Sequence, residues 1–223
     1  MAARCKGLCL LSLLVLMLSM PGVAGKKERL PAGIEKAAAI SAMLQYAQVA
    51  RRSQPSLPLL KARYGMELTW NDVVQTDPNG RVRIRMVDDS LLSIGANSTL
   101  RITSHEAQSH RTRVELVYGL MRAQIKKLGA GEVFEVRTPT AVAGVIGTDF
   151  GIDASDPKHV KFICLEGKVE ISGIDPNHAG TVSCEGGHTV TIDEGNSPSI
   201  PETADTAQMA RWRRITDPDS PDY

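Results

Sequence analysis

The residues best suited to chemistry lie in the segment TPTAVAGVIGTDFGIDAS, residues 138–155, where hydroxyl side chains stand near glycines. A nucleophilic Thr148 or Ser155 would need a nearby base to take its proton. The candidate bases are the five histidines: His105, His110, His159, His178 and His188. Only His159 and His188 fall in expected strands and could meet in space, and no pair has the His-x3-His spacing of a metal site. The pattern therefore predicts no catalytic residue, no metal site and no cofactor.

The same segment does not match a phosphate-binding loop. A P-loop needs Gly-x4-Gly-Lys-Ser/Thr, because the lysine and the hydroxyl bind the terminal phosphates and magnesium. Residues 144–148 contain two glycines and a threonine but no lysine. A structural interpretation fits better, because Pro139 can end or kink a strand and because Gly144 and Gly147 allow torsions or close packing that a side chain forbids. We therefore expect a strand, a glycine turn and a second strand, in a protein that is not an enzyme.

The N-terminal residues have the features of a secretory signal. Arg4 and Lys6 precede an apolar stretch at residues 8–20, and residues 22–24 offer small side chains at the usual cleavage spacing. The apolar stretch is about thirteen residues long, whereas a helix that crosses the hydrocarbon core needs roughly twenty. We expect a signal peptide at residues 1–24 and an exported chain, periplasmic or secreted, with no transmembrane segment after cleavage. The alternative is an uncleaved membrane anchor.

The charge balance excludes one class of partner. The chain has 26 basic and 25 acidic residues, so removal of Arg4 and Lys6 with the signal leaves 24 − 25 = −1. Nucleic-acid binding needs a strong basic excess, which is absent here. Three basic residues, Arg81, Arg83 and Arg85, alternate with apolar residues and are expected to form a solvated strand face that is a candidate interaction face.

Short alternating segments dominate the rest of the sequence. Residues 81–87, RVRIRMV, show the period-two pattern of a half-buried strand. Similar runs, separated by turn residues, are 91–94, 99–103, 113–118, 122–126, 133–138, 148–152, 159–165, 168–171 and 189–192. Gly119, Gly167 and Gly187 each precede an apolar-x-apolar run, which favours stacked strand–turn–strand units. The predicted fold is a single all-β domain, either a sandwich or a short solenoid-like stack.

Two cysteines, Cys164 and Cys184, remain after the predicted cleavage. An even pair in an exported chain indicates one disulfide, which would contribute about 3 kcal/mol in the chain-entropy model. The alternatives are two buried free thiols or a redox pair. A redox pair usually shows Cys-x-x-Cys, which is absent here.

The sequence VRTPTAVAGVIGTDFGI resembles the signature of the FecR-type domain, roughly V-x-T-P-x-A-x-x-x-V-x-G-T-x-F-x-V. The matching residues are Val136, Thr138, Pro139, Ala141, Val145, Gly147, Thr148 and Phe150. Further pieces follow the expected order: the "Gly-Asp-x-Val-x-Thr" lead-in at 60–76, a strand pair at 79–102, the "Leu-x-x-Gly-x-Val" hairpin at 116–125 and "Glu-Gly-x-Val-x-Val" at 165–171. The resemblance covers about residues 40–192. Asp89 departs from it, because the family has glycine at this turn position, and it would need a positive φ.

The resemblance implies a β-rich, extracytoplasmic and non-enzymatic domain. Its best-known members relay a surface signal by protein–protein contact to control iron-uptake genes. Those members carry a cytoplasmic sigma-factor-binding region and a membrane helix before this domain, whereas this sequence begins with a predicted signal. It is more similar to the stand-alone secreted members, so we expect contact with a protein partner in the envelope, in signalling or scaffolding. The identity of the partner and the oligomeric state are left open.

The resemblance also bears on residues 32–52, whose composition alone favours a helix. Family members usually begin with a strand here, and tertiary pairing can override propensity. We expect a flexible or helical lead-in at residues 25–38, the β domain at 39–194, and a Pro-, Ser- and Asp-rich tail at 195–223. The tail is expected to carry a short helix that is capped by Thr203 or Asp205.

An alternative function is binding of cell-wall polymer or another glycan in the periplasm. Sugar faces stack on exposed aromatic rings, yet aromatic residues make up only 4% of the chain. The candidates are Tyr64, Trp70, Tyr118 and Trp212. Core burial is the expectation for the first three.

Overall fold

The computed structural model describes residues 35–52, 58–106, 108–145 and 147–219. The predicted signal peptide, most of the 25–38 lead-in and residues 220–223 of the tail lie outside the described residues. The described part is built almost entirely of strands, with one α-helix near its C-terminal end. The all-β class with a short C-terminal helix is therefore confirmed. None of the helices in this part is long and apolar enough to span a bilayer.

The strands form two sheets that share β9 (Arg111–Gln124), and all pairs are antiparallel except β9–β10. Sheet A has the order β4 (Glu67–Thr69), β1 (Lys36–Leu44), β6 (Arg81–Met86), β7 (Leu91–Ile94), β9, β12 (Asp149–Asp156), β13 (His159–Glu166), β16 (His188–Asp193) and β17 (Glu202–Thr203). Sheet B has the order β3 (Leu60–Lys61), β2 (Ala47–Ala50), β5 (Val73–Thr76), β8 (Thr99–Glu106), β9, β10 (Val133–Arg137), β11 (Ala141–Val145), β14 (Lys168–Gly173) and β15 (Thr181–Glu185). A 3-10 turn, Pro176–His178, links β14 to β15.

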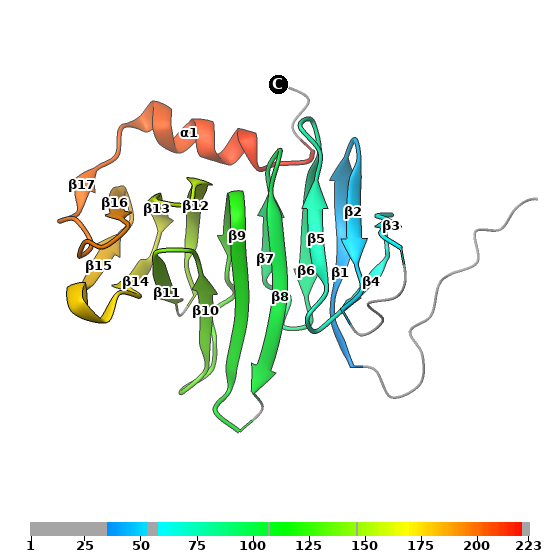
Figure 1. Ribbon diagram of the computed structural model, residues 1–223, viewed down its shortest axis with the longest axis horizontal. Helices are drawn as coiled ribbons and strands as arrows, with labels where there is room; N and C mark the ends of the chain where they lie inside the picture. Colours follow the sequence, from blue (N-terminus) through cyan, green and yellow to red (C-terminus); the bar gives the residue numbers. More distant parts are fainter. Residues whose placement is uncertain (1–34, 53–57, 107, 146, 220–223) are drawn as a thin grey trace, which may run out of the picture.

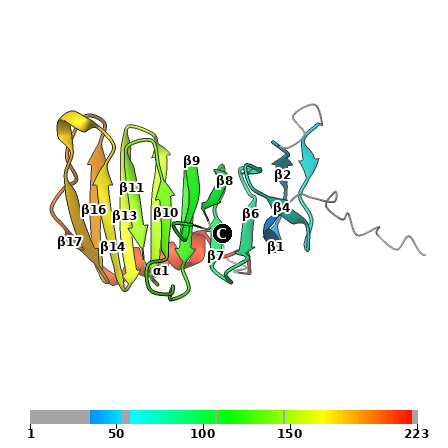
Figure 2. The same ribbon diagram turned by 90° about the horizontal axis from the view of Figure 1, so that it is seen from below.

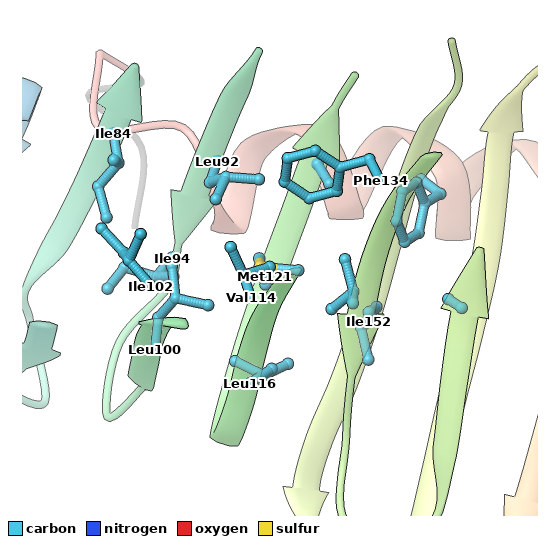
Figure 3. Close-up of a cluster of buried hydrophobic side chains, with 14 of the residues drawn as sticks. Ile84, Leu92, Ile94, Leu100, Ile102, Val114, Leu116, Met121, Phe134 and Ile152 are labelled. Atoms are coloured by element: carbon cyan, nitrogen blue, oxygen red, sulfur yellow. The ribbon is translucent and has the colours of Figure 1, made fainter. Parts of the chain in front are cut away.

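The two sheets enclose one continuous apolar core. Alternate side chains of every long strand point inward, and Ile84 and Leu92 of sheet A lie buried with Leu100 and Leu116 of sheet B (Figure 3). Burial of each such side chain contributes roughly 1.5–3 kcal/mol. Figures 1 and 2 show the strands following one another along the long axis, from β1, β2 and β4 at one end to β15, β16 and β17 at the other.

The turn predicted at Gly119 is wrong, because this residue lies within the single strand β9. The sequence predicts two strands, 113–118 and 122–126, whereas the structure has the single strand β9. Its first half pairs with β8 and β10 in sheet B, and its second half pairs with β7 and β12 in sheet A. Gly119, with φ +95°, bends the strand at the point where it leaves one sheet for the other. The glycine therefore marks a crossing between sheets and not a hairpin.

The N-terminal strand is longer than predicted. The strand expected from about Ile40 is present, but β1 begins at Lys36, so residues 36–38 are not helical. Ala37, Ala38 and Ile40 are buried in the core, and β1 pairs with both β4 and β6. Tertiary pairing thus overrides the helical propensity of this segment.

The C-terminal segment packs on sheet A. Helix α1 (Thr206–Ile215) is capped by Asp205, whose carboxylate accepts a hydrogen bond from the Gln208 N–H at 2.7 Å. The helix crosses the outer side of the sheet (Figure 1), and its Trp212 packs with Ile163 and Leu165 of β13 in a second, smaller apolar cluster. The tail is therefore part of the folded domain as far as Asp219.

Candidate functional site

The family motif forms a stack of turns at one edge of the sandwich. Gly147, Gly167 and Gly187 have φ values of +73°, +84° and +85°, and they are evenly spaced, since 167 − 147 = 20 and 187 − 167 = 20. At each of them the chain passes from one sheet to the other. The Gly186 N–H donates to the Gly167 carbonyl at 3.0 Å, so that adjacent turns are joined. Only glycine takes this left-handed conformation without strain, which explains the repeat.

Thr148 has a structural hydrogen bond where a catalytic hydroxyl would have a base. Its hydroxyl donates to the Lys168 carbonyl at 2.8 Å, and the residue is 4% exposed. An open hollow of about 500 Å³ lies beside it and includes the carboxylates of Asp149 and Glu166. Asp149 forms a bidentate ion pair with Arg122, whose Nε and Nη2 donate to its two carboxylate oxygens at 2.9 and 2.6 Å. Within the described residues, neither carboxylate is hydrogen-bonded to Thr148.

The remaining motif residues build the β10–β11 turn and the core. The Thr138 hydroxyl accepts from the Ala141 N–H at 3.0 Å and donates to the Ala141 carbonyl at 3.1 Å, which closes the turn that contains Pro139. The side chains that point into the core are those of Val136, Ala141, Val145 and Phe150. The motif is thus an architectural unit in this structure.

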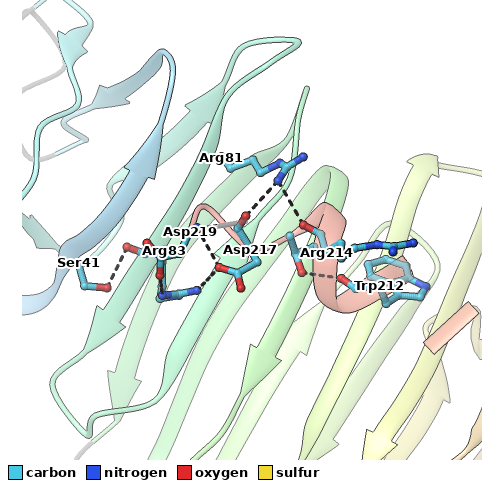
Figure 4. A network of polar contacts seen from close by, with 8 residues as sticks. Ser41, Arg81, Arg83, Trp212, Arg214, Asp217 and Asp219 are labelled. Carbon is cyan, nitrogen blue, oxygen red and sulfur yellow. Dashed lines mark hydrogen bonds and ion pairs between the residues drawn. The ribbon is translucent and has the colours of Figure 1, made fainter. Parts of the chain in front are cut away.

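The predicted arginine face is covered by the chain's own C-terminal segment (Figure 4). Arg81 is 1% exposed, and its Nη1 donates to the carbonyl oxygens of Arg214, at 3.2 Å, and Asp217, at 3.0 Å. Arg83 forms ion pairs with Asp217 and Asp219. Arg85 alone of the three is exposed. The expectation of a solvated face is therefore wrong for Arg81 and Arg83, because acidic and carbonyl groups of the tail occupy it.

The histidines do not assemble into a site. His159 bonds to Asp193, and His188 bonds to the Gly186 carbonyl at 3.3 Å. The two residues lie at opposite ends of the β13–β16 pair, so they do not meet. In the described parts of the chain, no three potential ligands come close enough to hold a metal ion.

The four aromatic residues considered for stacking on a glycan lie in separate segments of the chain. Trp70 is half-buried against the core and stacks on His105 with ring centroids 6.0 Å apart. Tyr64 and Tyr118 are 78% and 42% exposed, so the expectation that they are buried is wrong. Trp212 is covered by the contact between α1 and sheet A.

Cys164 and Cys184 are free thiols in this structure, not the disulfide that the sequence indicates. They lie on β13 and β15, in opposite sheets, and both side chains are buried in the core as small apolar groups. Burial, together with the neighbouring Cys184, raises the pKa of the Cys164 thiol to about 12. Burial also raises the pKa of Cys184.

These raised pKa values predict slow alkylation of the folded protein. Because the thiolate is the reactive form, a Cys164 pKa of about 12 lowers its thiolate fraction at pH 8 roughly a thousandfold below that of an ordinary cysteine, and the raised pKa of Cys184 acts in the same direction. Iodoacetamide should leave Cys164 and Cys184 unmodified in buffer and should alkylate both in urea, as measured by peptide mass spectrometry. If both stay unmodified in urea until a reductant is added, they form a disulfide and the free-thiol state is wrong.

A buried ion pair near the start of the β domain was missed by the sequence reasoning. Asp72 is fully buried and accepts from Arg51 Nη1 at 2.7 Å and from the Thr69 N–H at 2.9 Å. Asn71, with φ +70°, takes the left-handed conformation at the position where the family lead-in has glycine. The acidic residue of the lead-in pattern, Asp72, could have been singled out from the sequence. The sequence around Arg51 gives no indication that it is the partner of Asp72.

Strand β15 leaves one backbone edge open. It pairs with β14, and no other strand of the described chain pairs with it. At the same end of the molecule, β17 and Ser199 cover the edge of β16 in sheet A, where the Ser199 N–H donates to the Thr191 carbonyl at 2.9 Å. Within the described residues, sheet B therefore ends at a strand whose outer peptide groups pair with no further strand.

Comparisons with known proteins bear on the part of the chain that contains these glycine turns. Residues 72–170 match the family model described as "FecR protein". Over these residues the chain is therefore similar to the FecR family.

A solved structure has a similar fold. It is the crystal structure of "a putative anti-sigma factor from Parabacteroides distasonis ATCC 8503", determined at 1.65 Å and again at 2.50 Å resolution. The TM-score is 0.54 at 17% sequence identity, and the match covers 64% of this chain and 64% of that protein. At this identity the likeness concerns the fold alone. A comparison with curated proteins found no match.

Proposed function

We propose that this FecR-type domain is a non-enzymatic module of the cell envelope that acts by contact with a partner protein in signalling. The family match supports this, as does the similar fold of a protein described as an anti-sigma factor, since such factors work by binding another protein. The signal-like residues 1–24 support export, to the periplasm or beyond the cell. The non-enzymatic role is supported by the Thr148 hydroxyl, which is bonded to a carbonyl.

The open edge of β15 is the observation that carries the proposal. An extended segment of a partner can add to such an edge, because unpaired N–H and C=O groups supply main-chain hydrogen bonds. The other end strand of sheet B, β3, has two residues, whereas β15 has five. The partner segment would therefore extend sheet B beside β15 and lie near its exposed Thr181 and Glu185.

Photo-crosslinking in living cells tests this contact. A photoreactive amino acid at Glu185, on β15, should give a discrete crosslinked band that contains one envelope protein, identified by mass spectrometry. The same amino acid at Lys158, an exposed turn position on sheet A, is the matched control and should give no such band. Identical patterns at the two positions would remove the β15 proposal. A crosslinked smear that a cell-wall hydrolase collapses would favour the glycan alternative.

A further inference from the structure

A hollow lies between helix α1 and the outer side of sheet A, away from β15. Its volume is about 360 Å³, within the range of roughly 300–1,000 Å³ that is typical of small-molecule sites. Its walls come from β9, β12 and β13 on the sheet side and from α1 on the other. The lining residues that matter most are Leu120, Asp153, Lys161, Ile163, Arg211 and Trp212.

The part of the hollow next to the sheet is apolar. Ile163 and Trp212 are 1% and 8% exposed, and both pack in the cluster that holds α1 on the sheet. Gly151 on β12 makes room for the indole ring, because a Cβ there would lie 2.8 Å from Trp212 Cε3. The ring is thus fixed between the sheet and the helix, and it offers a preformed apolar wall to a ligand.

The hollow is lined by two basic side chains and one acidic side chain, and they differ in whether they already have hydrogen-bond partners. Lys161 and Arg211 have no ion-pair or hydrogen-bond partner for their charged groups among the described residues. The one carboxylate, Asp153, already accepts the Ser155 N–H at 2.9 Å. The formal charge of the lining is 2 − 1 = +1. Two unengaged cations beside an apolar wall are complementary to a molecule with an apolar body and an anionic head.

We propose that this hollow binds a small amphiphile with one carboxylate or phosphate head, held by Lys161 and Arg211, and an apolar body that lies against Trp212 and Ile163. Because α1 supplies four of the nine lining residues, an occupant stabilises the docked helix. A ligand that binds the docked state alone shifts the helix toward that state by mass action. No residue of β15 lines this hollow. The ligand proposal is therefore independent of the proposed contact between β15 and a partner.

Trp212 fluorescence provides the test. The chain has two tryptophans, so Trp70→Phe leaves Trp212 as the sole reporter in the full-length protein. Octanoate and octyl phosphate are titrated as the two candidate heads, with octanol and octyltrimethylammonium as neutral and cationic comparators. We expect a saturable change in fluorescence with at least one of the anions, at about tenfold or more lower concentration than with either comparator. The anion that saturates at the lower concentration shows whether the site prefers a carboxylate or a phosphate head group.

Charge-reversal variants show which side chains bind the anionic head group, and amide hydrogen exchange shows which segment the bound ligand stabilises. Lys161→Glu and Arg211→Glu should each weaken binding of the preferred anion by about tenfold or more. Arg213→Glu makes the same change at an exposed α1 position outside the hollow and should leave the affinity unchanged. The bound anion should slow amide exchange in residues 206–215 and not in β15. The proposal is wrong if octyltrimethylammonium binds equally well, if Arg213→Glu weakens binding as much as Arg211→Glu, or if no probe gives saturation.

Discussion

Replacing Gly119 by alanine should destabilise the domain by about 3–5 kcal/mol, a large part of the total stability of a domain this size. Its φ of +95° strains any residue that has a Cβ. An added Cβ would also lie 2.4 Å from Ser98 Oγ, 2.6 Å from Ser98 Cα and 2.7 Å from the Asn97 carbonyl oxygen. Ser98 has no freedom to move, because its hydroxyl accepts the Leu120 N–H at 2.9 Å and bonds to the Ala96 carbonyl at 3.0 Å.

Urea unfolding followed by circular dichroism measures this loss. Gly131→Ala is the matched control, since Gly131 also has a positive φ, +85°, but nothing lies within 4 Å of an added Cβ. Strain alone should cost about 1–2 kcal/mol there. Equal losses in the two variants would show that the close contact with Ser98 contributes nothing. Soluble protein without a cooperative transition for Gly119→Ala would agree with the larger loss.

Gly119 also shows where sequence reasoning reaches its limit. The period-two pattern on both sides of it correctly indicates strand, because alternation is a local property of the chain. A glycine between two such runs fits a hairpin and a bend within one strand equally well. The outcome depends on which strands pair with each half of β9, namely β8 and β10 before Gly119 and β7 and β12 after it, and the local pattern does not show these pairings.

The same limit applies to the arginine face. Alternation correctly placed Val82 and Ile84 in the core, so Arg81 and Arg83 had to point outward. The pattern does not tell what lies above an outward face. Asp217 and Asp219 are more than a hundred residues away, and they reach Arg83 only because Trp212 anchors α1 on the sheet. Gly151, which makes room for that indole ring, falls at an unspecified position of the motif pattern, so the motif gave no sign of its role.

The second large effect is expected from Asp72→Ala, which should cost about 3–5 kcal/mol because it leaves a mostly buried cation without its partner. The Arg51 side chain is 9% exposed and that of Asp72 is 0% exposed. The Thr69 N–H would also lose its acceptor. Urea midpoints again provide the measurement. Glu170→Ala, which breaks the exposed pair between Lys168 and Glu170, is the control and should leave the midpoint unchanged.

A double variant separates the lost charge pair from lost packing. Arg51→Met combined with Asp72→Leu removes both charges and keeps apolar volume at the site. If the penalty of Asp72→Ala comes from the unpaired Arg51 charge, the double variant should recover at least half of the lost stability, because a well-packed apolar pair often replaces a buried ion pair at little cost. A double variant that is no more stable than Asp72→Ala would instead assign the loss to the hydrogen bond with Thr69 and to the packing around β4 and β5.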